Sequence, residues 1–155
     1  HWQQQRSHVR AANRQLREFA RAAPLSEREW RETLLSIPYV GQVTLDVVLS
    51  ELGDVRRFRS QKQAVSYAGL APGIRSSGDR SKQLHITKEG SRLLRWALVE
   101  TAWRLTSRSR YWGYRYQRLA HRVGAKKAIV AIARRLLCVM VAMLQRGESY
   151  RLLPT

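Results

Sequence analysis

The chain has 155 residues, which is enough for one domain with a hydrophobic core, and its 44% hydrophobic content excludes a disordered polypeptide. It carries 29 Lys and Arg against 11 Asp and Glu, a formal net charge of +18. This excess, made mostly of Arg, predicts a polyanionic partner and favours nucleic acid, because guanidinium groups bind phosphate oxygens in pairs and stack on bases.

The first 22 residues predict a helix that Pro24 ends. Apolar or small residues recur at heptad spacing, at Trp2, Val9 and Leu16 and at Ala12 and Phe19. We expect residues 1–23 to form the end of a coiled coil that self-associates, or a linker helix. The alternative is an amphipathic helix packed on its own domain. Since the chain starts at His1 inside this pattern, we expect it to be a fragment of a longer protein.

Residues 24–155 then predict an all-α domain. Ser26 with Glu29 forms a capping box for a helix over 27–35, and further helices are expected over 43–52 and from Ser60 to Gly69. The run from Ser36 to Gly41 between the first two resembles a helix-hairpin-helix turn, in which backbone N–H groups and a helix N-terminus meet a phosphate. A plain corner between two packed helices is the alternative for this turn.

The stretch from Leu70 to Gly90 is the least regular, with a loop over 72–79 and a short strand over 83–86 expected. Helices should follow over 91–106, 111–122 and 126–144, the last three forming a C-terminal bundle. The apolar run 128–144 contains Arg134 and Arg135, each costing about 2.5–3.5 kcal/mol at a bilayer centre, so we expect a core helix and no membrane partner. One cysteine, Cys138, and scattered His and carboxylates predict no disulfide, metal or cofactor in this chain.

Two basic segments could carry chemistry. Ser76 and Ser77 stand in the Gly-rich loop, and cations around them could stabilise charge on a phosphodiester during attack by a serine; such loops are also common without catalysis. These cations are Arg75, Arg80, Lys82 and Lys88. Arg92 and Arg95 lie at i and i+3 on the next helix and could cradle a phosphate, or they could simply be solvated.

Aromatic residues interleave with arginines between positions 96 and 118. We expect Trp96 and Trp103, seven residues apart on one helical face, to be core residues. Tyr111 to Tyr116 are more open to base stacking.

Several segments together resemble one family. In order, these are Ser36-Ile-Pro-Tyr-Val-Gly41, the run 49–58, Ala64-Val-Ser-Tyr-Ala-Gly-Leu-Ala-Pro72, Ser76-Ser-Gly78 and Ile86-Thr-Lys-Glu-Gly90. They look like the C-terminal domain of the IS110 family of insertion-sequence transposases, also called bridge recombinases. Two positions depart from the family's usual residues: Tyr39 stands where glycine is common, and Ser91 where Asn is common.

The resemblance implies a DNA recombinase of the bacterial cytoplasm, associated with the nucleoid. It implies that a serine of this domain attacks DNA and forms a covalent phosphoserine link, and it places that serine at Ser77, with Ser76 as the fallback. It also implies a structured bridge RNA as a partner, together with DNA, and a RuvC-like domain that holds Mg²⁺ and is absent from this chain.

The phosphate-binding candidates are Arg75, Arg80, Lys82, Lys88, Arg92, Arg95 and Gly41. We expect the fragment alone to bind nucleic acid and to cleave it poorly or not at all. Two rival functions share the basic features: a non-catalytic helix-hairpin-helix module, and a basic RNA-binding scaffold.

Overall fold

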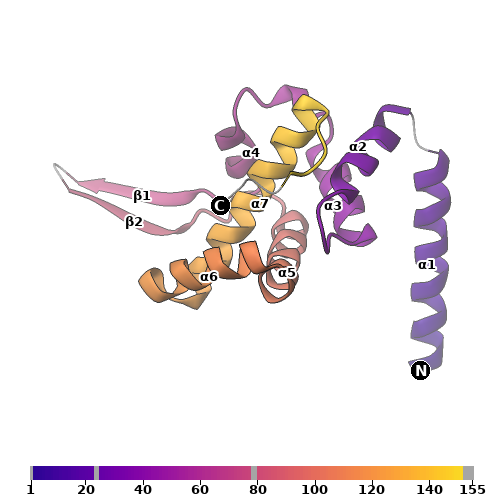
Figure 1. Ribbon diagram of the computed structural model, residues 1–155, viewed down its shortest axis with the longest axis horizontal. Coiled ribbons are helices and arrows are strands. Elements are labelled where there is room, and N and C mark those ends of the chain that lie inside the picture. The colour runs from indigo at the N-terminus through magenta and orange to yellow at the C-terminus, as the bar shows by residue number, and fades with distance from the viewer. Residues whose placement is uncertain (1, 23–24, 78–79, 152–155) are drawn as a thin grey trace.

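The computed structural model describes residues 2–22, 25–77 and 80–151 (Figure 1). The helices are α1 (Trp2–Ala22), α2 (Leu25–Leu35), α3 (Gln42–Leu52), α4 (Gln61–Tyr67), α5 (Arg92–Arg108), α6 (Arg110–Val123) and α7 (Ala125–Arg146), with a 3₁₀ turn, η1 (Val55–Arg57). A two-stranded hairpin, β1 (Pro72–Ser77) and β2 (Arg80–Ile86), interrupts them. The mostly helical architecture confirms the predicted fold class, and each predicted helix is present within one or two residues of its expected ends.

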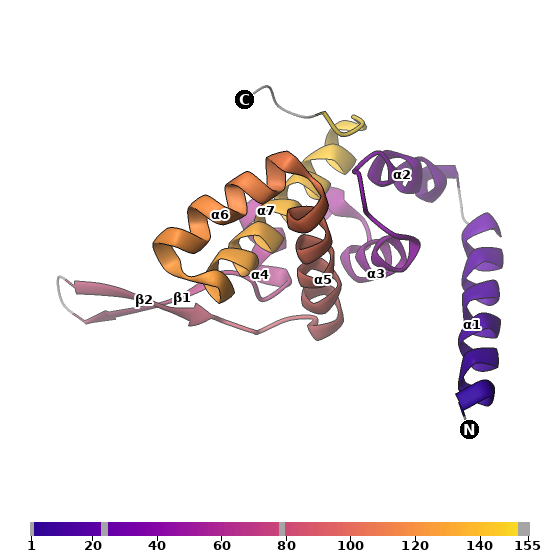
Figure 2. The same cartoon turned by 60° about the horizontal axis from the view of Figure 1, so that its bottom comes forward.

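Helix α1 stands beside the body of the domain in both ribbon views (Figures 1 and 2). Its stripe residues Trp2 and Val9 are 66% and 59% exposed. The predicted helix is therefore confirmed, and these two side chains do not pack on the chain's own domain. Pro24 lies outside the described residues.

Helix α7 is the centre of the core and packs against α2, α4, α5 and α6. By length and composition it could cross a membrane, but more than half of its apolar window is buried inside the protein. Its inward residues Ile132, Leu136 and Met140 are almost completely buried, and burying such a side chain stabilises a fold by roughly 1.5–3 kcal/mol. Arg134 avoids isolation in this helix because its Nε donates to the Leu70 carbonyl at 3.0 Å.

A half-buried ion pair fixes α2 against α3. Arg31 donates to Asp46 at 2.5 Å and lies 3.2 Å from Glu27, one turn earlier in α2. Both acids are mostly buried with Arg31, so the guanidinium offsets one of their two negative charges and is shared between them. The Arg31–Asp46 pair joins α2 to α3 across the turn.

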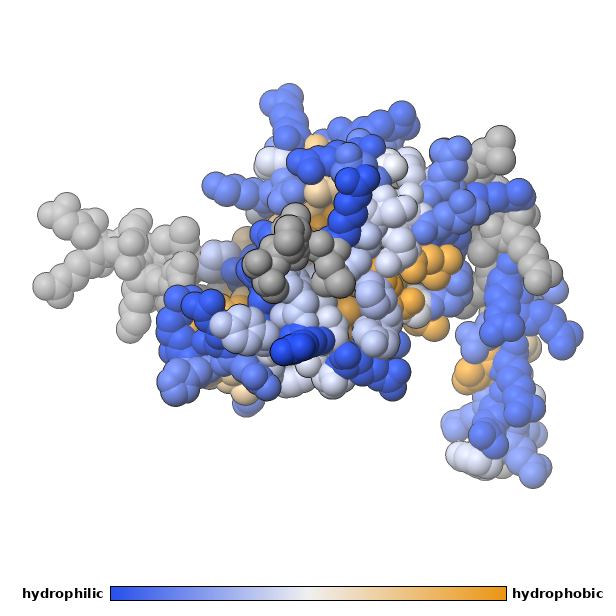
Figure 3. All heavy atoms as spheres, in the orientation of Figure 1, coloured by the Kyte–Doolittle hydropathy of each residue, from blue (hydrophilic) through white to orange (hydrophobic). Residues whose placement is uncertain are grey.

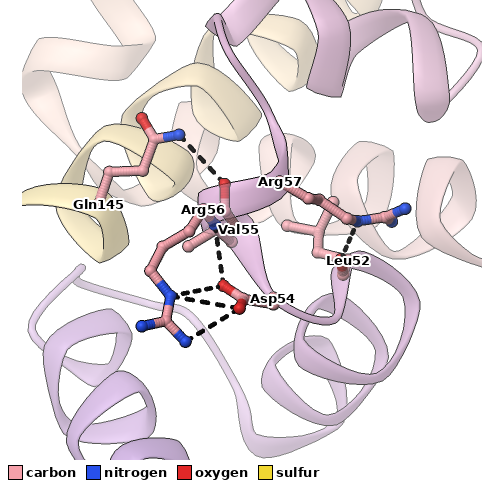
Figure 4. A network of polar contacts seen from close by, with 6 residues as sticks. All are labelled: Leu52, Asp54, Val55, Arg56, Arg57 and Gln145. Carbon is pink, nitrogen blue, oxygen red and sulfur yellow. Dashed lines mark hydrogen bonds and ion pairs between the residues drawn. The ribbon is translucent and has the colours of Figure 1, made fainter.

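The C-terminal end of α7 is tied to the 3₁₀ turn η1 (Figure 4). Gln145 donates through Nε2 to the carbonyls of Val55 and Phe58, both at 3.1 Å. Asp54 caps η1 by accepting from the Arg56 backbone N–H at 2.9 Å, and the Arg56 guanidinium holds the pKa of that carboxyl below its usual value. The two bonds from Gln145 join segments about ninety residues apart in sequence.

The segment predicted as a loop with a short strand forms a longer hairpin. Strand β1 pairs antiparallel with β2, with Ile74 opposite Gln83 and Arg75 opposite Lys82, and the register shifts between Pro72 and Ile74. The loop prediction for 72–77 was therefore wrong, and the strand predicted over 83–86 begins earlier. Polar residues fill most of both strands, so the alternation of apolar and polar residues that normally indicates a strand is weak. The two strands are defined mainly by their backbone pairing with each other.

Candidate nucleic-acid interface

The turn between α2 and α3 has the backbone shape that a glycine normally allows. Tyr39 has φ of +64°, in the left-handed region, and Gly41 is extended and forms the N-cap of α3. No side chain caps this helix, so its first N–H groups are left without a side-chain acceptor at the N-terminus. Tyr39 therefore adopts a backbone conformation that strains a residue with a Cβ.

Two arginines from α5 lie over this turn. Arg104 donates through Nη2 to the hydroxyls of Thr44 and Thr101, both at 3.2 Å. The two threonines are buried and share a hydrogen bond of 2.8 Å, so they fix the direction of the guanidinium. The other terminal nitrogen of Arg104 lies 3.4 Å from the position that a Cβ on Gly41 would occupy.

Arg108, one turn further along α5, lies with its guanidinium carbon 6.0 Å from the centre of the Tyr39 ring. The N-terminus of α3 and these two cations therefore form one positive region, suited to a phosphate. Gly41 was predicted as a phosphate-binding residue, whereas Arg104 and Arg108 were not. No local pattern could have identified them, because the contacts of Arg104 with this turn join residues about 60 positions apart.

A second basic region surrounds the start of α5, where two backbone segments meet closely. Gly90 has φ of +156°, and a Cβ there would lie 2.2 Å from the Tyr67 carbonyl oxygen. Lys88 donates its backbone N–H to the Gly69 carbonyl at 3.1 Å, and Thr87 donates to Ala71 at 3.0 Å. These contacts anchor the base of the hairpin to the end of α4.

Of the cations predicted here, Arg95 has a structural role. Its Nη1 donates to the carbonyls of Ala68 and Gly90 at 3.3 and 3.2 Å, so this arginine holds the two segments together. Lys88 and Arg92 are exposed. Ser91 caps α5 by accepting from the Leu94 N–H at 3.1 Å, as the predicted start of this helix requires.

The two candidate nucleophiles lie near the far end of the hairpin. Ser77 is the last residue of β1 and pairs with Arg80, the first residue of β2, while Ser76 pairs with Ser81. The described structure does not extend to Gly78 or to the side chains of five predicted site residues, namely Arg75, Ser76, Ser77, Arg80 and Lys82. The backbone nevertheless brings both serines and these three cations onto two paired strands.

The prediction that Trp96 and Trp103 belong to the core was wrong. Their exposed fractions are 53% and 44%. Helix α5 buries a different stripe, which includes Leu94, Leu98 and Leu105, and seven-residue spacing places both tryptophans together on the outer face. Trp103 packs edge-on against Tyr116 of α6 at 5.6 Å between ring centres.

The outer face of α6 is basic and aromatic. Arg115 donates to the Tyr111 hydroxyl at 3.0 Å, and Arg118 lies 5.8 Å from the centre of the Tyr114 ring. Tyr114 is 59% exposed, whereas Tyr111 and Tyr116 are half-buried against neighbouring rings. A groove runs along this face from the turn that joins α5 to α6.

Acidic and metal-ligating side chains do not gather in the same way. Among the described residues, no group of three or more His, Cys, Asp or Glu could hold a metal ion. The arrangement of the described residues is thus suited to binding a polyanion through cations and helix termini.

Comparison with known proteins identifies the family of this chain. The model of the transposase IS116/IS110/IS902 family matches residues 31–118, which contain the turn, the hairpin, α5 and most of α6. The transposase for insertion sequence element IS1111A of Coxiella burnetii is 33% identical over 123 residues, 75% of this chain and 33% of that protein.

Two further relatives cover more of the chain. The insertion element IS110 protein of Streptomyces coelicolor is 33% identical over 146 residues, 91% of this chain and 34% of that protein. The pilin gene-inverting protein of Moraxella lacunata is 36% identical over 129 residues, 80% of this chain and 40% of that protein. The chain therefore spans between a third and two fifths of the length of these relatives.

Proposed function

Because this chain belongs to the IS116/IS110/IS902 family of transposases, we propose that it is the serine-bearing, nucleic-acid-binding part of a DNA recombinase. The observation that carries the proposal is the placement of Ser76 and Ser77 on a hairpin that projects from a basic helical body (Figures 1 and 2). A projecting hairpin can reach a phosphodiester that the body holds. Its paired strands carry Arg75, Arg80 and Lys82 alongside the serines.

In the proposed reaction, Ser77 attacks the phosphorus of a DNA phosphodiester. A bond forms between the serine Oγ and phosphorus, the bond to one deoxyribose oxygen breaks, and that oxygen leaves as a hydroxyl group after taking a proton. The serine proton passes to a base outside this chain. Attack by a hydroxyl of a second DNA end then breaks the phosphoserine bond, restores the serine and joins the new strands.

The cations of the chain would hold the phosphates during these steps. Lys88 and Arg92 are exposed at the base of the hairpin, and Arg104 lies over Gly41 at the turn before α3. Such contacts position a strand and stabilise the negative charge that develops on the phosphoryl oxygens. The described residues do not fit a Mg²⁺ site, so we assign the expected metal to a RuvC-like part outside this chain.

The proposed partners are DNA and a structured bridge RNA, in the bacterial cytoplasm where the chromosome lies. Self-association would use α1, because Trp2 and Val9 lie seven residues apart on its exposed stripe. Within one assembly, serines from one subunit would then work with the RuvC-like part of another.

The decisive test uses the full-length parent protein with its bridge RNA, Mg²⁺ and a donor and target DNA pair. We would compare wild type with Ser77→Ala, Ser76→Ala and the control Ser66→Ala, an exposed serine on α4. The measurement is a protein–DNA adduct that survives denaturation. We expect only Ser77→Ala to lose it; loss in Ser76→Ala alone would move the nucleophile by one residue, and adduct in every variant would exclude both serines as the nucleophile.

A non-catalytic helix-hairpin-helix module is the second candidate function. The turn at Tyr39 to Gly41, with Arg104 beside the α3 N-terminus, favours it because that geometry binds a phosphate without chemistry. Under this alternative, no variant of Ser76 or Ser77 would change the products formed on DNA, and Arg104→Ala would weaken binding.

A further inference from the structure

The outer face of α6 carries a dense positive charge that the proposed serine chemistry does not use. The sequence of α6 contains no acidic residue, and its basic residues are Arg110, Arg115, Arg118, His121 and Arg122. All five are exposed. At 100° per residue they fall, with Tyr111 and Tyr114, on one continuous arc of the helix. Figure 3 shows strongly hydrophilic residues gathered over this part of the body, at its lower left.

Tyr114 lies near the middle of this arc and has the most open aromatic ring on the helix. It is 59% exposed, while Tyr111 packs edge-on against Trp112, and Tyr116 against Trp103. Arg118 lies on one side of the Tyr114 ring, 5.8 Å from its centre. A flat ring that is open to solvent and bordered by an arginine matches the way proteins hold an unpaired base beside its phosphates.

We propose that the outer face of α6 binds a single strand of nucleic acid, with an unpaired base stacked on Tyr114 and the flanking phosphates on Arg110, Arg118 and Arg122. A single strand fits better than a duplex because bases inside a duplex already stack on one another and cannot cover an added ring. The inference goes beyond the proposed serine reaction and needs no catalysis by this chain.

The position of α6 suits such a strand. The hairpin and the far end of α6 leave the body on the same side in both ribbon views (Figures 1 and 2). The face is held rigidly, since α6 packs against both α5 and α7 and its N-terminus is capped by Ser109. A nucleic-acid strand that is unpaired near the hairpin would therefore lie beside the rigid outer face of α6.

The test is equilibrium binding of the 155-residue chain to fluorescein-labelled oligothymidylate, oligouridylate and a duplex of the same length, measured by fluorescence anisotropy at several salt concentrations. The variants are Tyr114→Ala, Tyr114→Phe and Arg118→Ala. Arg56→Ala is the matched control, because it removes the same charge from an exposed arginine that is already paired with Asp54. Circular dichroism confirms that each variant is folded.

We expect Tyr114→Ala to weaken binding to the single strands about fivefold or more, with Tyr114→Phe close to wild type and the duplex little affected. Arg118→Ala should lower the slope of log affinity against log salt by about one, and Arg56→Ala should not. The two single-strand probes distinguish RNA from DNA as the source of the strand.

The inference is overturned if Tyr114→Ala leaves single-strand affinity unchanged, or if Arg56→Ala weakens binding as much as Arg118→Ala. The first result would show that no base stacks on Tyr114. The second would show that an arginine on this face contributes no more to binding than any other exposed arginine. Neither result depends on the adduct assay with Ser77→Ala, so failure here and failure of the serine mechanism are separately visible.

Discussion

Arg104 and Gly41 meet although they stand 63 positions apart in the sequence, with a guanidinium nitrogen 3.4 Å from the place where a Cβ on the glycine would stand. The arginine comes from the last turns of α5 and the glycine from the N-cap of α3. Thr44 and Thr101, buried between the same helices, accept from the other end of the guanidinium. A phosphate at the α3 N-terminus would therefore meet a cation whose direction is already fixed.

We predict that Arg104→Ala weakens binding to duplex DNA of any sequence by a similar factor and lowers the salt slope by about one. The reason is that a phosphate contact adds affinity and counterion release without reading bases. Fluorescence anisotropy across a salt series measures both quantities. Arg56→Ala serves as the control of equal charge, and an unchanged salt slope in Arg104→Ala would remove this arginine from the interface.

Tyr39 gives a second prediction, about stability. Its φ of +64° costs a residue with a Cβ about 1–2 kcal/mol, which glycine does not bear. We predict that Tyr39→Gly raises the free energy of unfolding by about 0.5–1 kcal/mol relative to Tyr39→Ala, which keeps the strain but also removes the ring beside Arg108. Urea denaturation of the two variants isolates the backbone effect; equal midpoints would contradict it.

The secondary structure was predicted from the sequence better than the packing of the helices was. Capping residues and apolar spacing predicted the helices because those signals are local, and Ser91 caps α5 as expected. The outward position of Trp96 could not be predicted, because which stripe of α5 is buried depends on how α3, α6 and α7 pack around it. The full hairpin was not predicted for a related reason, because its strands are defined by pairing with each other and carry few alternating apolar residues.

The candidate site was predictable in composition but not in contacts. Lys88 and Arg92 are exposed as a phosphate-binding role requires, whereas Arg95 donates to the carbonyls of Ala68 and Gly90. The spacing of residues along the sequence does not indicate that the Arg95 side chain bonds to a carbonyl 27 positions away. The same holds for Arg104, whose partner Thr44 is 60 positions away.

Gly90 supplies a third prediction, because the base of the hairpin depends on close backbone approach. A Cβ at Gly90 would lie 2.2 Å from the Tyr67 carbonyl oxygen and 2.9 Å from the Gly69 nitrogen, and neither backbone atom can move aside cheaply. We predict that Gly90→Ala destabilises the domain by at least about 3 kcal/mol, from overpacking together with a strained φ.

Gly53→Ala is the matched control, since Gly53 also has positive φ, +59°, but nothing lies within 4 Å of its added Cβ. This variant should lose only about 1–2 kcal/mol of backbone energy. Thermal denaturation of both variants compares the two effects. If Gly90→Ala were no less stable than Gly53→Ala, the segments 67–71 and 87–90 would not be packed as the structure shows.

Tyr150 gives the prediction with a pH dependence. Its hydroxyl accepts from the Trp112 indole N–H at 3.0 Å, and its backbone N–H donates to Ser36 at 2.7 Å, so it closes the C-terminal segment over the core. Burial raises the pKa of the Tyr150 phenol above its ordinary value of about 10. The folded protein therefore holds this proton more tightly than the unfolded chain does.

It follows that the stability contributed by the neutral phenol is fully present below about pH 10 and is lost as pH rises through the higher folded pKa. Tyr150→Phe cannot ionise, so its free energy of unfolding should fall less steeply above pH 10 than that of wild type. At neutral pH the same variant should be less stable by about 1 kcal/mol, because the Trp112 N–H loses its acceptor. Urea denaturation at neutral pH and at two alkaline pH values measures both effects, and parallel alkaline slopes for the two proteins would show that Tyr150 titrates as it does in the unfolded chain.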